Sequence, residues 1–118
     1  MTALGRANIA ALSYDERAKF SADYRSRVKP ADRKHQEEVT VQAIHDYEKH
    51  GFCFSMGDWQ EDVFAAGVPM ISSDGSKILA FSCSGPVHEM TRKRLVSEIG
   101  PRLMELRDRV HTALGGVF

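Results

Sequence analysis

Two serines at alternate positions, Ser82 and Ser84, are the polar side chains of this chain with the most suggestive spacing. They lie in the apolar run ILAFSCSGP, and a second apolar run, VFAAGVPMI, precedes it across Ser72-Ser73-Asp74-Gly75-Ser76. Asp-Gly between two β-favouring runs predicts a β-hairpin. If Asp74 and Gly75 are the two turn residues, Gly67 faces Ser82 and Ala65 faces Ser84 across the strands, and Ser73 faces Ser76.

The two faces of this hairpin differ in size and polarity, because side chains alternate along a strand. One face carries large apolar side chains and is expected to face the core: Leu79, Phe81 and Cys83 beside Phe64, Ala66, Val68 and Met70. The other face carries a small, hydroxylated block of Ala65, Gly67, Ser82 and Ser84. Such a block can leave a hollow for a small ligand. Two plainer alternatives stay open: the serines face water, or a helix packs closely against the small residues.

Composition limits the classes of function. A chain of 118 residues with 42% hydrophobic residues suits one domain with one modest core. Lys plus Arg equal Asp plus Glu at 16 each, so no net basic field attracts nucleic acid. No apolar run is long enough to cross a membrane, and the N-terminus lacks the pattern of a signal peptide. We therefore expect a cytoplasmic protein in which Cys53 and Cys83 are reduced, packed thiols.

Three helices are expected before the strands. Thr2 to Leu12 is predicted to form the first, whose start offers unpaired N–H groups that suit an anion. Ser13-Tyr14-Asp15-Glu16 has the pattern of a capping box and begins a second helix, from about Tyr14 to Tyr24. Arg25 to Lys34 contains Pro30 and many basic residues, and we interpret it as a solvated surface loop. Glu37 to Lys49 is predicted to be the third helix, ending at Gly51.

The remaining elements are a short strand at Phe52–Ser55, an irregular segment with the only tryptophan, Trp59, the hairpin, and a final helix from Thr91. Pro101 is expected to kink this last helix without ending it, since its apolar stripe continues in phase. The five histidines form no metal-ligand pattern, so neither a metal nor a cofactor is expected. Three strands make a thin sheet for this much helix. That suggests completion by another chain or by a missing N-terminal segment.

Several short motifs, in this order, resemble those of the IclR-type bacterial transcription regulators. The matching pieces are Thr2–Ala7 (TALGRA), Gly51-Phe52, Asp62-Val63, Ala66–Pro69 (AGVP), Asp74-Gly75, Ser82–Pro86 (SCSGP), Arg94-Leu95 and Leu114-Gly115. Each piece alone is weak, but their order and spacing together are specific. The resemblance covers essentially the whole chain and points to the C-terminal part of the effector-binding domain.

The resemblance implies an α+β, GAF-like domain with an antiparallel sheet flanked by helices, here a partial domain in the order α-α-α-β-β-β-α. Residues 1–118 would be an N-terminally truncated effector-binding domain without the winged helix-turn-helix that binds operator DNA. Its partners would be a small-molecule effector, commonly a carboxylate, and copies of itself in a dimer or tetramer. Operator DNA would be bound only through the absent domain.

The resemblance also implies the effector site. Matched to this sequence, its positions are Ala3, Leu4, Ser55, Ala65, Ser82 and Ser84. Family members with small-acid effectors often carry an aspartate in place of Ser55 and a cysteine in place of Ala65. The smaller side chains here favour a larger or aromatic carboxylate, with Trp59 closing over it.

Sensing without catalysis is thus the leading hypothesis, and two alternatives remain. One is a purely structural oligomerisation module with an empty site. The other is a hydrolase that uses Ser82 or Ser84 as nucleophile, which would require a nearby general base. The sequence has no nucleophile-elbow motif, so we expect no catalytic residue.

Overall fold

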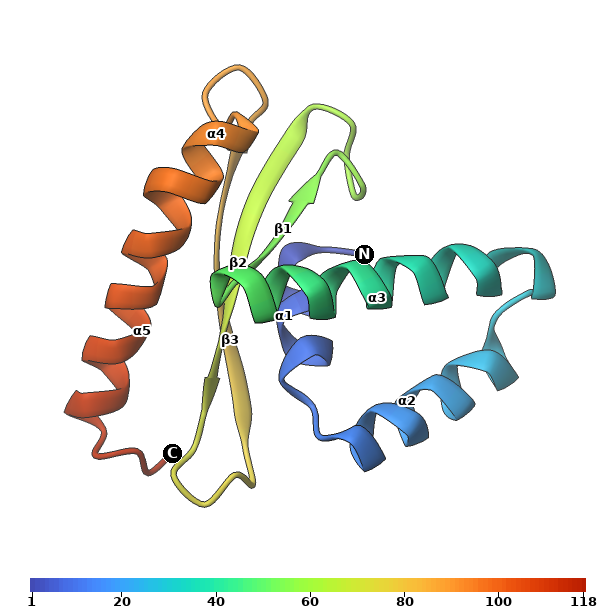
Figure 1. The fold of residues 1–118 in the computed structure, drawn as a ribbon, viewed down its shortest axis with the longest axis horizontal. Helices are drawn as coiled ribbons and strands as arrows, with labels where there is room; N and C mark the ends of the chain where they lie inside the picture. Colours follow the sequence, from blue (N-terminus) through green and yellow to red (C-terminus); the bar gives the residue numbers. More distant parts are fainter.

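A three-stranded sheet lies between two layers of helix in the computed structural model, which describes all residues from Met1 to Phe118 (Figure 1). The helices before the sheet are α1 (Ala3–Ala11), α2 (Tyr14–Arg27) and α3 (Pro30–His50). The strands are β1 (Cys53–Met56), β2 (Val63–Ile71) and β3 (Ile78–Pro86). A continuous helical segment follows, made of α4 (Arg92–Arg94), the π-helical turn η1 (Leu95–Ile99) and α5 (Gly100–Ala113). The predicted α+β class and element order are confirmed.

The sheet is antiparallel with the strand order β1-β2-β3. Gly67 pairs with Ser82, Ala65 with Ser84 and Ile71 with Ile78, so the predicted hairpin register is confirmed. The predicted two-residue turn is wrong. Ser72 N–H donates to the Lys77 carbonyl at 2.9 Å, which leaves residues 73–76 as a four-residue turn.

The turn is longer than expected because only Gly75 adopts a positive φ (75°), whereas the two-residue turn favoured by Asp-Gly needs two such residues. Asp74 instead accepts hydrogen bonds from the Ser72 and Ser76 side chains and from the Ser76 backbone. These bonds lower the pKa of Asp74 to about 2. Ser73 does not pair with Ser76; its N–H donates to the Gly116 carbonyl near the C-terminus.

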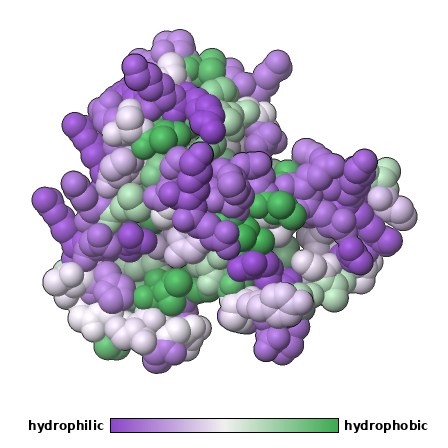
Figure 2. All heavy atoms as spheres, viewed as in Figure 1, coloured by the Kyte–Doolittle hydropathy of each residue, from purple (hydrophilic) through white to green (hydrophobic).

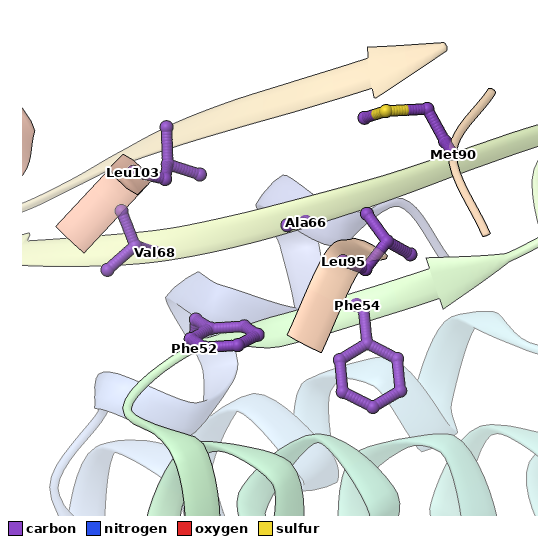
Figure 3. Packing of buried hydrophobic residues seen from close by; sticks show 7 residues of the cluster. All are labelled: Phe52, Phe54, Ala66, Val68, Met90, Leu95 and Leu103. Carbon is purple, nitrogen blue, oxygen red and sulfur yellow. The ribbon is translucent and has the colours of Figure 1, made fainter. Parts of the chain in front are cut away.

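The face of the sheet with large side chains packs against η1 and α5 and forms the main core (Figure 3). Its buried members are Phe52, Phe54, Ala66, Val68, Met90, Leu95 and Leu103. A smaller buried cluster of Ala10, Ala43 and Cys53 lies on the opposite face, where α1 and α3 pack. The chain thus places apolar side chains on both faces of β1.

One expected core residue is not buried. Leu79 is 48% exposed, although it lies on the same face as Val68 and Met70. The reason is its place on the outermost strand: α5 packs mainly against β2, so its cover does not extend fully over β3. Phe81 and Cys83, on the same face of β3, are only partly buried.

The basic segment expected to be a loop is mostly helical. α2 runs three residues past Tyr24 to Arg27, and α3 begins at Pro30, so only Val28 and Lys29 connect them. Proline occupies the first turn of a helix without loss, because the N–H that it lacks would have no intrahelical partner there. The capping box is confirmed: Ser13 Oγ accepts from Glu16 N–H, and the Glu16 carboxylate accepts from Ser13 N–H.

The final helix passes through the π-helical turn η1, which ends at Ile99, two residues before Pro101. The prediction that Pro101 does not end the helix is confirmed, since the helix continues to Ala113. Gly100 matters at this point for packing: a Cβ there would lie 2.1 Å from the Phe52 ring. The helix can therefore lie directly on the core only because this position is glycine.

The α2–α3 hairpin extends away from the sheet and its surface is mostly hydrophilic, on the right of Figure 2. None of the residues of α2 is buried. No helix in the structure is both long enough and apolar enough to cross a membrane.

Candidate functional site

The six residues proposed for ligand binding lie together around one hollow of about 160 Å³ between the start of α1 and the sheet. α1 contributes Ala3 and Leu4, β1 contributes Ser55, β2 contributes Ala65, and β3 contributes Ser82 and Ser84. Thr2, Trp59 and Val63 complete the lining. The fold therefore joins residues from four separate elements at one place.

Strand register explains why the sheet residues converge. Ser55 pairs with Ala65, and Ala65 pairs with Ser84, so these three form a row straight across the sheet. Residues in such a row point to the same face. Ser55 is buried, while Ser84 and its neighbour Ser82 are exposed, so burial of the side chains increases along the row from β3 to β1.

Part of the small-residue block is covered by a closely packed helix and part of it forms a hollow, so two of the arrangements expected from the sequence occur together. Gly67 is not part of the hollow, because α1 packs directly on it: a Cβ there would lie 2.3 Å from the Ala3 carbonyl oxygen. Ala65, Ser82 and Ser84 lie beyond this contact and remain uncovered by the helix. The close contact at Gly67 therefore holds the start of α1 at the edge of the hollow.

The electrostatic character of the hollow comes from helix α1 and from hydroxyl groups. Thr2 Oγ1 accepts from Gly5 N–H at 3.1 Å and caps the helix. The N–H groups of Ala3 and Leu4 belong to the first turn and have no acceptor within the helix. The first turn contains no acidic residue. With no charged side chain in its lining, the hollow presents donors and the positive end of a helix dipole, an arrangement suited to an anion.

Trp59 lies at the rim of the hollow, in the segment between β1 and β2, and is 63% exposed. Two lining residues were missed by reasoning from the sequence. Val63 has the same strand parity as Ala65, so the alternation of side chains could have identified it. Thr2 was interpreted only as a helix cap, and its position next to Ala3 was the available signal.

The lining offers no general base for a serine nucleophile. It contains no histidine, aspartate or glutamate, and neither Ser82 nor Ser84 has a hydrogen-bonded side-chain partner. His88, the histidine nearest to these serines in sequence, is exposed next to Glu89 instead. A serine needs such a base to attack a carbonyl group.

Larger clefts occur elsewhere, and two of them are lined by acidic as well as basic side chains. A groove of about 320 Å³ separates α2 from α3, and the ion pair of Arg25 with Glu37 crosses it. A cleft of about 480 Å³ lies beside Arg6 and Asp58, which form an ion pair with each other. Neither cleft has the acid-free lining of the hollow, so size alone does not identify the site.

Neither cysteine belongs to the hollow. The Cys53 thiol donates to the Ala43 carbonyl at 3.2 Å, and its burial raises its pKa to about 12. Cys53 and Cys83 are both free thiols, as expected.

No protein-family model matches the sequence, and no curated protein does. Solved structures do match. An IclR family transcriptional regulator from Brucella abortus is 33% identical to this chain, with a TM-score of 0.88, and the match covers 96% of this chain. The chain spans only 42% of that regulator, less than half of its length.

Two further structures share the fold at lower identity. The IclR of Thermotoga maritima is 20% identical over 97% of this chain and 46% of its own, with a TM-score of 0.67. The inducer-binding domain of the transcription factor PobR from Acinetobacter, solved as a double mutant with 3-hydroxybenzoic acid, is 17% identical. The match covers 92% of this chain and 64% of that domain, with a TM-score of 0.71.

Proposed function

Because this chain belongs to the IclR family of transcriptional regulators and spans less than half of a full regulator, we propose that it is a ligand-sensing domain. In this proposal residues 1–118 form the later part of an effector-binding domain with the GAF-like arrangement. The ligand occupies the hollow between α1 and the sheet. The domain binds the ligand without catalysing a reaction.

The observation that carries the proposal is the convergence of hydroxyl groups and helix N–H groups on one uncharged hollow. Ser55 and Ser84 offer hydroxyls from the sheet, and Ala3 and Leu4 offer N–H groups from α1. The lining of the hollow comes from four elements, α1, β1, β2 and β3, whereas an incidental gap in packing needs only two. Donors without a neighbouring acid favour a carboxylate over a cation or a neutral ligand.

Trp59 supports a ligand larger than the smallest acids. An exposed indole at the rim can stack on an aromatic or other flat apolar group. The PobR domain, whose fold this chain shares, was solved with an aromatic carboxylic acid. We therefore place aromatic carboxylates first among the ligands to be tested.

In the full regulator, ligand binding would shift an equilibrium that a winged helix-turn-helix domain reads out on operator DNA. A ligand can do so only if it binds one state more tightly than the other. Self-association into a dimer or tetramer is part of the same proposal. The readout on DNA concerns residues outside 1–118, and the sensing role of the hollow depends neither on it nor on self-association.

A structural module without a ligand is the alternative that one observation favours. α1 already packs against Gly67, so the same helix could serve only to cover the sheet. In that case no carboxylate would bind at the hollow.

The test is a thermal-unfolding screen of the chain against small and aromatic carboxylates, including acetate, benzoate and 3-hydroxybenzoate. A ligand that binds only the folded state at a hundredfold excess over its Kd adds about 2.7 kcal/mol to the free energy of unfolding. We expect at least one aromatic carboxylate to raise the Tm.

Substitutions at the hollow separate specific binding from a general salt effect. Ser82→Ala and Ser84→Ala remove exposed hydroxyls, so both variants are expected to fold and to lose most of the Tm increase. Ser97→Ala is the matched control, since its hydroxyl donates to the Lys93 carbonyl within the last helical segment. An increase that persists in both hollow variants, or a screen without any increase, would favour the structural module.

A further inference from the structure

The segment that carries Trp59 is a tight loop with little other support. Gly57 N–H donates to the Val63 carbonyl at 3.1 Å, and Val63 N–H donates to the Gln60 carbonyl at 3.0 Å. Gly57 has a φ of 82°, and a Cβ there would lie 2.9 Å from the Glu61 carbonyl oxygen. These contacts close the base of the loop. They do not determine where its tip, with Asp58 and Trp59, lies relative to helix α1.

One side-chain contact joins this tip to α1. Arg6 lies one turn after Ala3, and its guanidinium forms an ion pair with the Asp58 carboxylate. The Arg6 side chain is only 6% exposed, whereas that of Asp58 is 36% exposed, so the pair has one buried partner and one partner that faces water. Arg6 Nε also lies 3.5 Å from the Met1 carbonyl oxygen. Arg6 thus contacts both segments that flank the start of α1.

We propose that Arg6 and Asp58 form a positioning pair that holds Trp59 at the rim of the hollow and thereby sets the affinity for ligands that reach the indole. Neither charged residue lines the hollow, so the pair acts through Trp59 and not by touching the ligand. The part of this inference that concerns affinity rests on the proposed sensing function. The part that concerns the loop does not.

A pair with one buried partner can hold a loop better than a fully exposed pair, because water and salt compete with it less on the buried side. Removing the charge of Asp58 should nevertheless leave a folded protein. Arg6 shares its cleft with a second acid, the buried Asp46, which would still balance the guanidinium charge. Asp46 lies on α3 and accepts from Gln42 Nε2 at 2.8 Å, so it cannot hold the Trp59 loop.

The first experiment needs no ligand. Asp58→Asn keeps the size of the side chain and removes its charge, and Asp62→Asn is the matched control at the other end of the same loop. Trp59 is the only tryptophan, so its fluorescence anisotropy reports on this loop alone. We expect lower anisotropy and faster amide exchange at residues 57–62 in Asp58→Asn, with Asp62→Asn like the parent. Unchanged anisotropy and exchange in Asp58→Asn would overturn the proposal.

The second experiment measures the Kd of benzoate and of acetate for the parent chain, Asp58→Asn, Trp59→Ala and the double variant. We expect Asp58→Asn to weaken benzoate several-fold and to leave acetate unchanged, since acetate is too short to reach the indole. In the Trp59→Ala background, Asp58→Asn should have no further effect, which is the sign that the pair acts through Trp59. Fully additive effects, or equal losses for both acids, would show a general structural role and contradict the inference.

The two experiments distinguish failure of the inference from failure of the proposed function. If the parent chain binds neither acid, the sensing proposal loses its support, and the loop measurement alone decides whether Arg6 and Asp58 position Trp59. If the parent binds benzoate while Asp58→Asn behaves like the parent in both experiments, sensing stands and the positioning pair is rejected.

Discussion

Single residues decide the chemistry that this domain can do. The hollow contains hydroxyls and helix N–H groups and no acidic or histidine side chain, which is the chemistry on which the proposed binding of a carboxylate rests. The one thiol on the helix α1 side of the sheet, Cys53, is fully buried and donates to a carbonyl. Burial in this way favours the neutral thiol, which makes Cys53 an unreactive packing residue.

The raised pKa of Cys53 predicts a loss of stability at alkaline pH. Folding raises this pKa from 9.0 to about 12, so the folded state keeps a proton that the unfolded state releases. The contribution to stability is therefore complete below about pH 9 and is lost as pH rises from there towards 12. Denaturant unfolding at pH 8, 9 and 10 should show a steeper alkaline decline for the parent than for Cys53→Ala.

Cys83→Ala is the control for this experiment, since Cys83 is only partly buried. Cys53→Ala also lowers the stability at every pH by removing a packed side chain, so the slope with pH is the quantity to compare. Equal slopes in the parent and Cys53→Ala would contradict the prediction.

At the scale of elements, the position of α1 is the feature that creates the site. The helix lies so close to β2 that only glycine fits at position 67, and this contact places Ala3 and Leu4 beside the serines. Strand register brings together the residues on the sheet side of the hollow, because Ser55, Ala65 and Ser84 align across three strands. The hollow is thus the place where a closely packed helix begins.

Gly67→Ala should displace α1. The added methyl group would collide with backbone atoms of Ala3, which cannot rotate away as a flexible side chain can. We expect a loss of about 1–3 kcal/mol in the free energy of unfolding, the usual range for overpacking, together with loss of carboxylate binding. Denaturant unfolding and the thermal screen measure the two effects.

Gly85→Ala is the matched control on β3. A Cβ there would approach the Met90 side chain at 2.8 Å, and a methionine can change rotamer to make room. Its cost should be smaller, and ligand binding should be retained. A Gly67→Ala variant with parent-like stability and binding would mean that α1 does not need its close contact.

For the whole molecule, stability should be distributed unevenly. The main core joins the sheet to η1 and α5, whereas the α2–α3 hairpin projects from the body and α2 buries none of its residues (Figure 1). Regions with few buried contacts open locally at low free-energy cost. The main core supports the sheet side of the site, and α3 packs on α1 through Ala43, so only α2 is expected to open without disturbing the site.

This distribution predicts contrasting responses. Leu95→Ala, at a fully buried core position, should cost about 2–5 kcal/mol in the free energy of unfolding, as large-to-small core changes do. Tyr14→Ala in α2, where the side chain is 84% exposed, should stay within about 0.5 kcal/mol of the parent. Amide exchange should be faster along α2 than along β2. Comparable protection of α2 and β2 would contradict this picture.

The order of elements, the hairpin register and the shared face of Ala65, Ser82 and Ser84 could be predicted from the sequence, because turn signals and strand alternation are local and periodic. The places of Ala3, Leu4 and Ser55 beside them came only from the resemblance to a family, since no periodicity connects those segments to the hairpin. The shape of the turn, the helical start at Pro30 and the exposure of Leu79 could not. The exposure of Leu79 depends on how far α5 extends over the sheet, and the turn contacts Gly116 near the C-terminus. The helical start at Pro30 is a local feature, but a proline in the first turn of a helix and a proline in a loop give the same signal in the sequence.

The sequence by itself determined which side chains share a face, since the two-residue period of a strand requires no partner to specify it. Only the tertiary structure decided which part of the small-residue block is filled and which is empty. That outcome depends on the closeness of α1 to Gly67, which fills one end of the block and leaves Ala65, Ser82 and Ser84 uncovered. Contacts of this kind depend on packing in three dimensions, which periodicity along one segment does not encode.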